Sequence, residues 1–112
     1  MNPVRPTRFY SNRQEKHVAK ALGGKKVANS GATPFNKGDV TTGQWLIECK
    51  TCTREQKTFT LRKEWIDKNR QEAFAMRKPY TAIAIDFGDG EQHYLINEAL
   101  FKQLKDYMEE QT

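Results

Sequence analysis

Apolar positions along the chain follow helical spacing in some stretches and form short runs in others. Helical spacing predicts three helices, over residues 11–22, over 61–77 and from Asn97 onward, with Ser11 or Asn12 and Thr60 as caps. Apolar runs near Gly and Pro predict strands at 25–29, 39–40, 44–51, 80–87 and 92–96. The order helix, three strands, helix, two strands, helix predicts an α/β fold with a mixed central sheet flanked by helices.

The strand at 44–51 carries an unusual pair of charges. Alternation places Glu48 and Lys50 on one face and Ile47 and Cys49 on the other. A carboxylate and an ammonium within an apolar strand need partners, because unpaired buried charge is costly. Asp39 lies in the preceding short strand, so we expect Asp39 and Glu48 to hold a divalent metal, with Lys50 beside the same phosphate. The alternative is a surface salt bridge from Glu48 to Lys50 or Arg54.

The first helix places an acid on its apolar side. Glu15 shares a helical face with Val18 and Leu22. Taken alone, Glu15 is expected at the edge of this face and in solvent. Glu15 is a candidate site residue only in combination with Asp39 and Glu48.

The last helix and the strand at 80–87 are both expected in the core. The strand alternates too little to face water on one side. The helix carries an apolar stripe, which is more often core than interface. Its residues are Leu100, Phe101, Leu104, Tyr107 and Met108.

Composition favours a polyanionic partner such as nucleic acid. The chain has 112 residues, enough for one domain, with a net charge of +5. It contains no apolar run of membrane-spanning length and no signal-peptide pattern, so a cytoplasmic protein is expected. Residues 1–10 are expected to form an irregular basic arm, either a disordered end or a contact to DNA phosphates.

Cys49 and Cys52 have C-x-x-C spacing. A zinc site would need a second pair of ligands, and His17 and His93 do not form one. A redox pair is not expected because Cys49 lies in a strand rather than at a helix start. We expect Cys49 to be a small core residue.

Several sequence blocks together are similar to a known nuclease superfamily. They are Ser30-Gly31, Lys37-Gly38-Asp39-Val40 and Leu46-Ile47-Glu48-Cys49-Lys50, preceded by the helical Glu15. This set resembles the PD-(D/E)XK superfamily, and within it the archaeal-type Holliday-junction resolvases and their phage-encoded relatives. The resemblance covers roughly residues 12–87. Gly38 replaces the Pro of the superfamily motif, Cys49 replaces an aliphatic residue, and nothing beyond Phe87 matches.

The resemblance implies a restriction-endonuclease-like core (αβββαβ) and a set of catalytic roles. Mg²⁺, with Mn²⁺ as a substitute, would be bound by Asp39, Glu48 and the main-chain carbonyl of Cys49. Glu15 would complete the site through a water or a second metal, and Lys50 would orient the attacking water or contact the phosphate. The other groups implied near the scissile phosphate are Ser30 and Lys37.

The expected substrate is a four-way DNA junction cut by a homodimer, since its two cleaved strands are related by a two-fold axis. The interface would come from the last helix or from residues 74–76. Basic residues expected on the DNA-binding surface, unless they form an ordinary solvated face, are Lys25, Lys26, Arg54, Lys57, Arg62 and Lys63. Alternative functions are another structure-specific or nicking endonuclease, a non-catalytic DNA-binding module, or a zinc-binding accessory protein.

Overall fold

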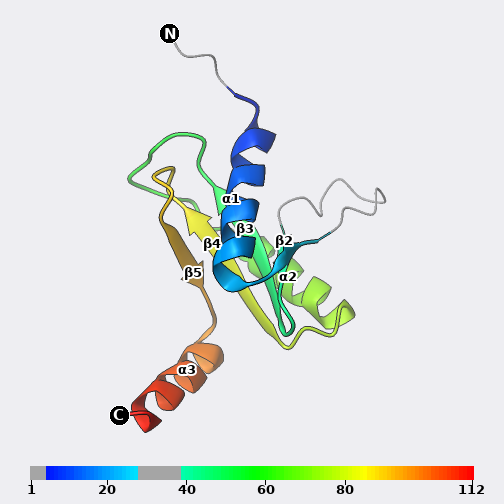
Figure 1. The fold of residues 1–112 in the computed structure, drawn as a ribbon, viewed down its shortest axis with the longest axis vertical. Coiled ribbons are helices and arrows are strands. Elements are labelled where there is room, and N and C mark those ends of the chain that lie inside the picture. Colours follow the sequence, from blue (N-terminus) through cyan, green and yellow to red (C-terminus); the bar gives the residue numbers. More distant parts are fainter. Residues whose placement is uncertain (1–4, 28–38) are drawn as a thin grey trace.

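A computed structural model describes residues 5–27 and 39–112 and contains one five-stranded mixed sheet (Figure 1). The elements are α1 (Thr7–Leu22), β1 (Lys25–Lys26), β2 (Asp39–Thr41), β3 (Trp45–Thr51), α2 (Lys63–Ala75), β4 (Tyr80–Asp86), β5 (Gln92–Leu95) and α3 (Glu98–Glu110). The strands lie in the order β1-β2-β3-β4-β5. Only the β3–β4 pair is parallel, because α2 connects these strands. The predicted mixed sheet flanked by helices is confirmed.

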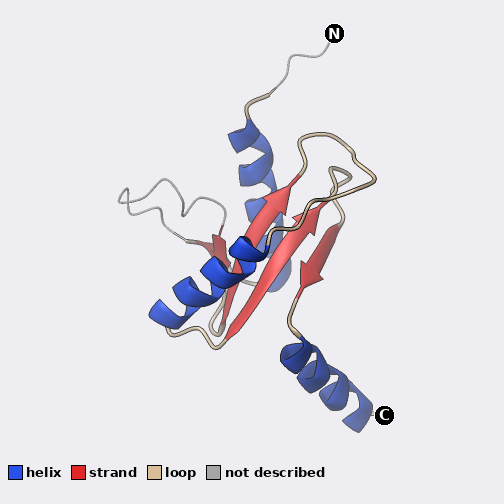
Figure 2. Cartoon of the chain, turned by 180° about the vertical axis from the view of Figure 1, so that it is seen from behind, coloured by secondary structure: helices blue, strands red, loops and turns tan. Residues whose placement is uncertain are grey.

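Two helices cover opposite faces of the sheet. α1 lies on one face, over β1 to β3, and α2 lies on the other, over β3 and β4 (Figures 1 and 2). The core under α1 is a compact apolar cluster of Val18, Val40, Ile47, Cys49, Ala82 and Ala84. The side of β3 that faces α2 therefore carries Leu46, Glu48 and Lys50, as alternation predicts.

Helix starts differ from the sequence predictions at two of three sites. α1 begins at Thr7, so residues 7–10, expected in an irregular arm, are helical. Pro6 takes the N-cap position with φ −59°, a fixed angle that suits a helix entrance. α2 begins at Lys63 rather than next to Thr60, and its N-cap has no side-chain hydrogen bond. The third start is confirmed, because Asn97 Oδ1 accepts a hydrogen bond of 2.9 Å from the Leu100 N–H.

The prediction that the apolar stripe of α3 lies in the core is wrong. α3 leads away from the sheet, and Leu100 is its buried residue (Figure 1). Phe101, Tyr107 and Met108 are 61%, 60% and 68% exposed. Helical periodicity indicates that a helix has an apolar face but not what covers that face. In the part of the chain that the structure describes, no helix could serve as a membrane span.

Candidate active site

The β2–β3 hairpin brings two acids together. The turn after β2 is closed by a hydrogen bond from the Trp45 N–H to Thr42 Oγ1, and the resulting register places Asp39 directly opposite Glu48. Side chains opposite one another in an antiparallel pair share a face and have Cβ atoms about 5 Å apart. Both acids are buried, at 7% and 8% exposure, on the face covered by α2.

Burial raises the pKa of both acids. The pKa of Asp39 rises from 3.8 to about 8, first because the carboxyl is desolvated and then because Glu72 and Glu48 lie nearby, while Lys68 partly offsets the rise. Desolvation also raises the pKa of Glu48, against the opposing effect of Lys50 and Lys68. Protein cations therefore do not fully compensate these carboxylates.

One oxygen of Glu48 lacks a partner. Oε2 is buried and has no hydrogen bond, while Oε1 lies 3.7 Å from the Lys50 ammonium. A buried carboxylate oxygen without a donor fits a site that receives a cation or water. The oxygen-only donor set of Asp39 and Glu48 fits Mg²⁺, which prefers oxygen ligands and typically keeps several waters.

Lys50 is held from two sides. Its ammonium forms the ion pair with Glu48 and lies 4.5 Å from the centre of the Trp65 ring, a cation–π contact. The Trp65 ring packs edge-on against Phe59, which in turn packs against Phe87. The salt bridge considered from the sequence is thus present, but it lies on the α2-covered face with a largely buried acid.

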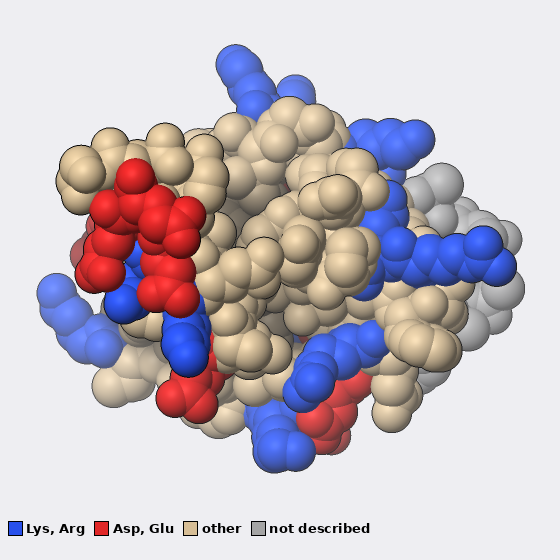
Figure 3. All heavy atoms as spheres, turned by 90° about the horizontal axis from the view of Figure 1, so that it is seen from below, with Lys and Arg blue, Asp and Glu red and all other residues tan. Residues whose placement is uncertain are grey.

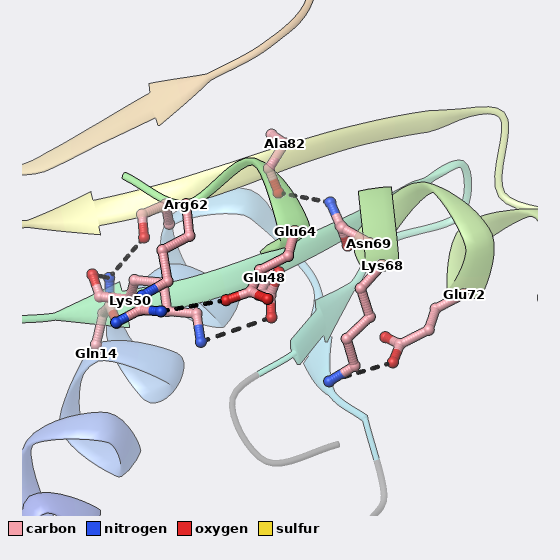
Figure 4. Close-up of polar contacts among 10 residues, drawn as sticks. Gln14, Glu48, Lys50, Arg62, Glu64, Lys68, Asn69, Glu72 and Ala82 are labelled. Carbon is pink, nitrogen blue, oxygen red and sulfur yellow. Dashed lines mark hydrogen bonds and ion pairs between the residues drawn. The ribbon is translucent and has the colours of Figure 1, made fainter. Parts of the chain in front are cut away.

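α2 contributes charged groups that the sequence analysis did not assign to the site. Lys68 and Glu72 are separated by one turn of α2 and form an ion pair of 3.7 Å (Figure 4). Asn69, between them, donates a 3.1 Å hydrogen bond to the carbonyl of Ala82, which fixes α2 to β4. The sequence did contain an indication of these groups, because the polar residues at positions 68, 69 and 72 lie on the same helical side as Trp65 and Ala73.

Glu15 has a different partner. It is buried on α1 and forms an ion pair of 3.7 Å with Lys26 of β1. Desolvation raises its pKa and Lys26 opposes the rise. The groups that shift Asp39 and Glu48 come from β3 and α2. In the described residues no three His, Cys, Asp or Glu side chains form a metal-binding group. Participation of Glu15 in the same metal site stays a prediction.

The basic residues predicted to bind DNA are spread over two regions. Lys25 and Lys26 are exposed on the edge strand β1. Four others are exposed in the loop after β3 or at the start of α2, namely Arg54, Lys57, Arg62 and Lys63. Ser30 and Lys37 lie outside the described residues.

The two cysteines are free thiols. Cys49 is buried in the core cluster, as expected, with its side chain on the α1 face, away from Glu48. Burial raises the pKa of its thiol. Its main-chain carbonyl, the predicted third metal ligand, lies between Glu48 and Lys50 along β3.

Comparison of the chain with protein-family models, with curated proteins and with solved structures finds no match. The functional interpretation therefore rests on the chemistry of the site.

Proposed function

We propose that this chain is a divalent-metal-dependent endonuclease that hydrolyses phosphodiester bonds in branched DNA, with four-way junctions as its substrate. The core from α1 to β4 would then be the restriction-endonuclease-like unit of the superfamily that the sequence resembles. One observation carries the proposal: Asp39 and Glu48 lie opposite each other in a buried hairpin, beside Lys50, with Glu48 Oε2 lacking a hydrogen-bond partner.

The residues of the site have complementary roles. Asp39 and Glu48 would hold Mg²⁺, together with the main-chain carbonyl of Cys49. The bound ion would supply a water of lowered pKa and positive charge next to the phosphate. Lys50, fixed by its contact with Trp65, orients the attacking water or contacts a non-bridging phosphate oxygen. Lys68 adds positive charge on the α2 side of the acids.

The choice of substrate is supported by charge and symmetry. A net charge of +5 favours a polyanion, and phosphate contacts would make binding depend on salt. A junction is cut on two strands related by a two-fold axis, so a homodimer would supply two sites. A cytoplasmic location would give access to DNA.

Cleavage of a labelled synthetic four-way junction, with a matched duplex and a flap as controls, tests the proposal. We expect Mg²⁺- or Mn²⁺-dependent cutting of the junction. Asp39→Asn and Glu48→Gln should each reduce the rate by more than the roughly 10- to 100-fold cost of losing a metal's outer-shell partner. Glu64→Gln, which alters an exposed acid on α2, is the matched control and should retain activity.

Binding measurements separate the proposed enzyme from its alternatives. The two inactive variants should still bind the junction, and calorimetry should show weaker Mn²⁺ binding. Lys50→Ala should lose most of the rate while Mn²⁺ affinity is kept. Junction binding by the natural chain without any cleavage would indicate a non-catalytic module, and preferred cleavage of the flap would indicate another structure-specific nuclease. Full activity of Asp39→Asn would refute the metal assignment.

A further inference from the structure

The outer face of α3 is a continuous apolar stripe. Phe101, Leu104, Tyr107 and Met108 follow one another at intervals of three, three and one residues, which places them on one side of the helix, and all four are exposed. Hydrogen bonds close α3 at both termini. The Asn97 side chain caps its start, and the Gln111 N–H donates to the Met108 carbonyl at its end. A well-formed helix with an uncovered apolar face is typical of an interaction surface.

The apolar surface continues from α3 onto the body of the protein. Leu104 borders a hollow of about 330 Å³ on the α1 side of the sheet. Its other borders include Leu22 and Tyr94, which are themselves 42% and 39% exposed. The hollow and the helix therefore form one patch, and α3 is not an isolated appendage.

We propose that α3 is a dimerisation helix that packs antiparallel against α3 of a second copy of this chain. The patch has the size such a dimer needs. With roughly 200 Å² for each large side chain, the exposed parts of α3, Leu22 and Tyr94 amount to about 600 Å². A standard interface buries about 800 Å² per partner, of which about 60% is apolar. The uncovered apolar area matches that requirement.

Charge selects the antiparallel arrangement. The first part of α3 carries Glu98, Lys102 and Lys105, with a net charge of +1, whereas the last part carries Asp106, Glu109 and Glu110, with a net charge of −3. A parallel pair would place the acidic ends together, whereas an antiparallel pair places each acidic end near the lysines of the other copy and aligns the helix dipoles favourably. In the view from below, the largest group of acidic side chains lies at the left, a smaller one lies at the lower right, and uncharged residues cover the middle (Figure 3).

The two-fold axis would pass between Leu104 and Lys105, which places Phe101 of one copy opposite Met108 of the other. This inference assigns an interface to the homodimer of the proposed function. It rests on the proposed function only in the statement that the two active sites of the dimer act on one junction. Association is measured without DNA or metal. A dimeric protein without nuclease activity would therefore refute the proposed function and leave the interface intact.

Sedimentation equilibrium tests the surface with two matched double variants. Leu104→Gln with Met108→Gln replaces apolar positions of α3, and Arg62→Gln with Glu64→Gln replaces an exposed ion pair at the start of α2 while keeping the net charge. We expect the natural chain and the α2 variant to be dimers and the α3 variant to dissociate at least about tenfold more readily. The replaced side chains are exposed, Leu104 least so, and circular dichroism checks that the variants stay folded. A monomeric natural chain would overturn the proposal.

Disulfide cross-linking tests the orientation in a Cys52→Ser background. Leu104→Cys chains should cross-link to one another. A mixture of Phe101→Cys and Met108→Cys chains should give mainly the mixed disulfide, because the two positions face each other in the antiparallel pair. Cross-links of 101 to 101 and of 108 to 108 would show a parallel pair and overturn the inference. Absence of cross-linking in a dimeric protein would show that another surface, such as the exposed Phe74, forms the contact.

Discussion

Replacing Asp39 with Asn should stabilise the metal-free protein at neutral pH. Asn has the shape of a protonated Asp, and its amide can donate to Glu72 as the protonated carboxyl would. The natural acid is protonated in the folded chain near pH 7, since its pKa is raised to about 8, but is ionised once the chain unfolds. Folding at pH 7 therefore requires the uptake of a proton, which the Asn variant avoids.

The size of the effect follows from the pKa change. The reference value for Asp39 is 3.8, about three units below pH 7. At 1.36 kcal/mol per unit, proton uptake lowers the free energy of unfolding by about 4 kcal/mol at pH 7. This is a large part of the 5–15 kcal/mol typical of a domain. Folding raises the pKa of Asp39, so its contribution to the free energy of unfolding is fully present below the pKa of the unfolded chain. This contribution is lost as the pH rises from about 4 to about 8.

Urea denaturation in the presence of EDTA, repeated between pH 5 and pH 8.5, measures this effect. We expect the free energy of unfolding of the natural chain to fall across this range relative to Asp39→Asn. Glu55→Gln, which removes an exposed acid, should follow the natural chain. Parallel pH profiles for the natural chain and Asp39→Asn, or a variant less stable at every pH, would refute the reasoning.

Three further predictions concern neighbouring positions. Glu72→Gln removes a negative charge that raises the pKa of Asp39 in the folded chain, so the pH-dependent loss of stability should end at lower pH and be smaller in the same denaturation series. Gly88→Ala should destabilise by about 1–3 kcal/mol in urea denaturation, because φ is +99° and a Cβ there would overlap the main chain of the loop after β3, whereas Gly43→Ala meets open space. Asn97→Ala should lose about 1 kcal/mol of helix stability, seen as faster amide exchange in α3, because it removes the side chain that caps the helix.

Local patterns were sufficient to predict the hairpin that forms the site. Alternation along residues 45–50 placed Glu48 and Lys50 on one face, and the short turn before Trp45 set the pairing with Asp39. Pairings between distant elements were less predictable. The approach of Glu72 to Asp39 depends on how α2 crosses the sheet, and the contact of Glu15 with Lys26 depends on the position of an edge strand. Neither can be read from spacing within one element.

The same limit explains α3. Its stripe obeys the rule for a core helix, and Leu100 does pack inward. Whether the remaining residues of the stripe become core depends on where the chain after β5 places the helix, and α3 extends away from the sheet rather than lying on it. The apolar periodicity of α3 therefore predicted burial correctly only in the first turn of this helix.

The charges gathered around the hairpin explain why the site would take a dication. Asp39, Glu48 and Glu72 carry three negative charges when ionised, against two positive charges on Lys50 and Lys68. Near pH 7 the proton on Asp39 brings the metal-free balance to zero, and a divalent ion that displaces this proton would change it to +1, which suits a phosphodiester. Because Asp39 keeps its proton near pH 7 in the metal-free chain, Mg²⁺ or Mn²⁺ binding should release close to one proton per chain. Calorimetry in buffers of different ionisation enthalpy measures that number, and binding without proton release would contradict the raised pKa of Asp39.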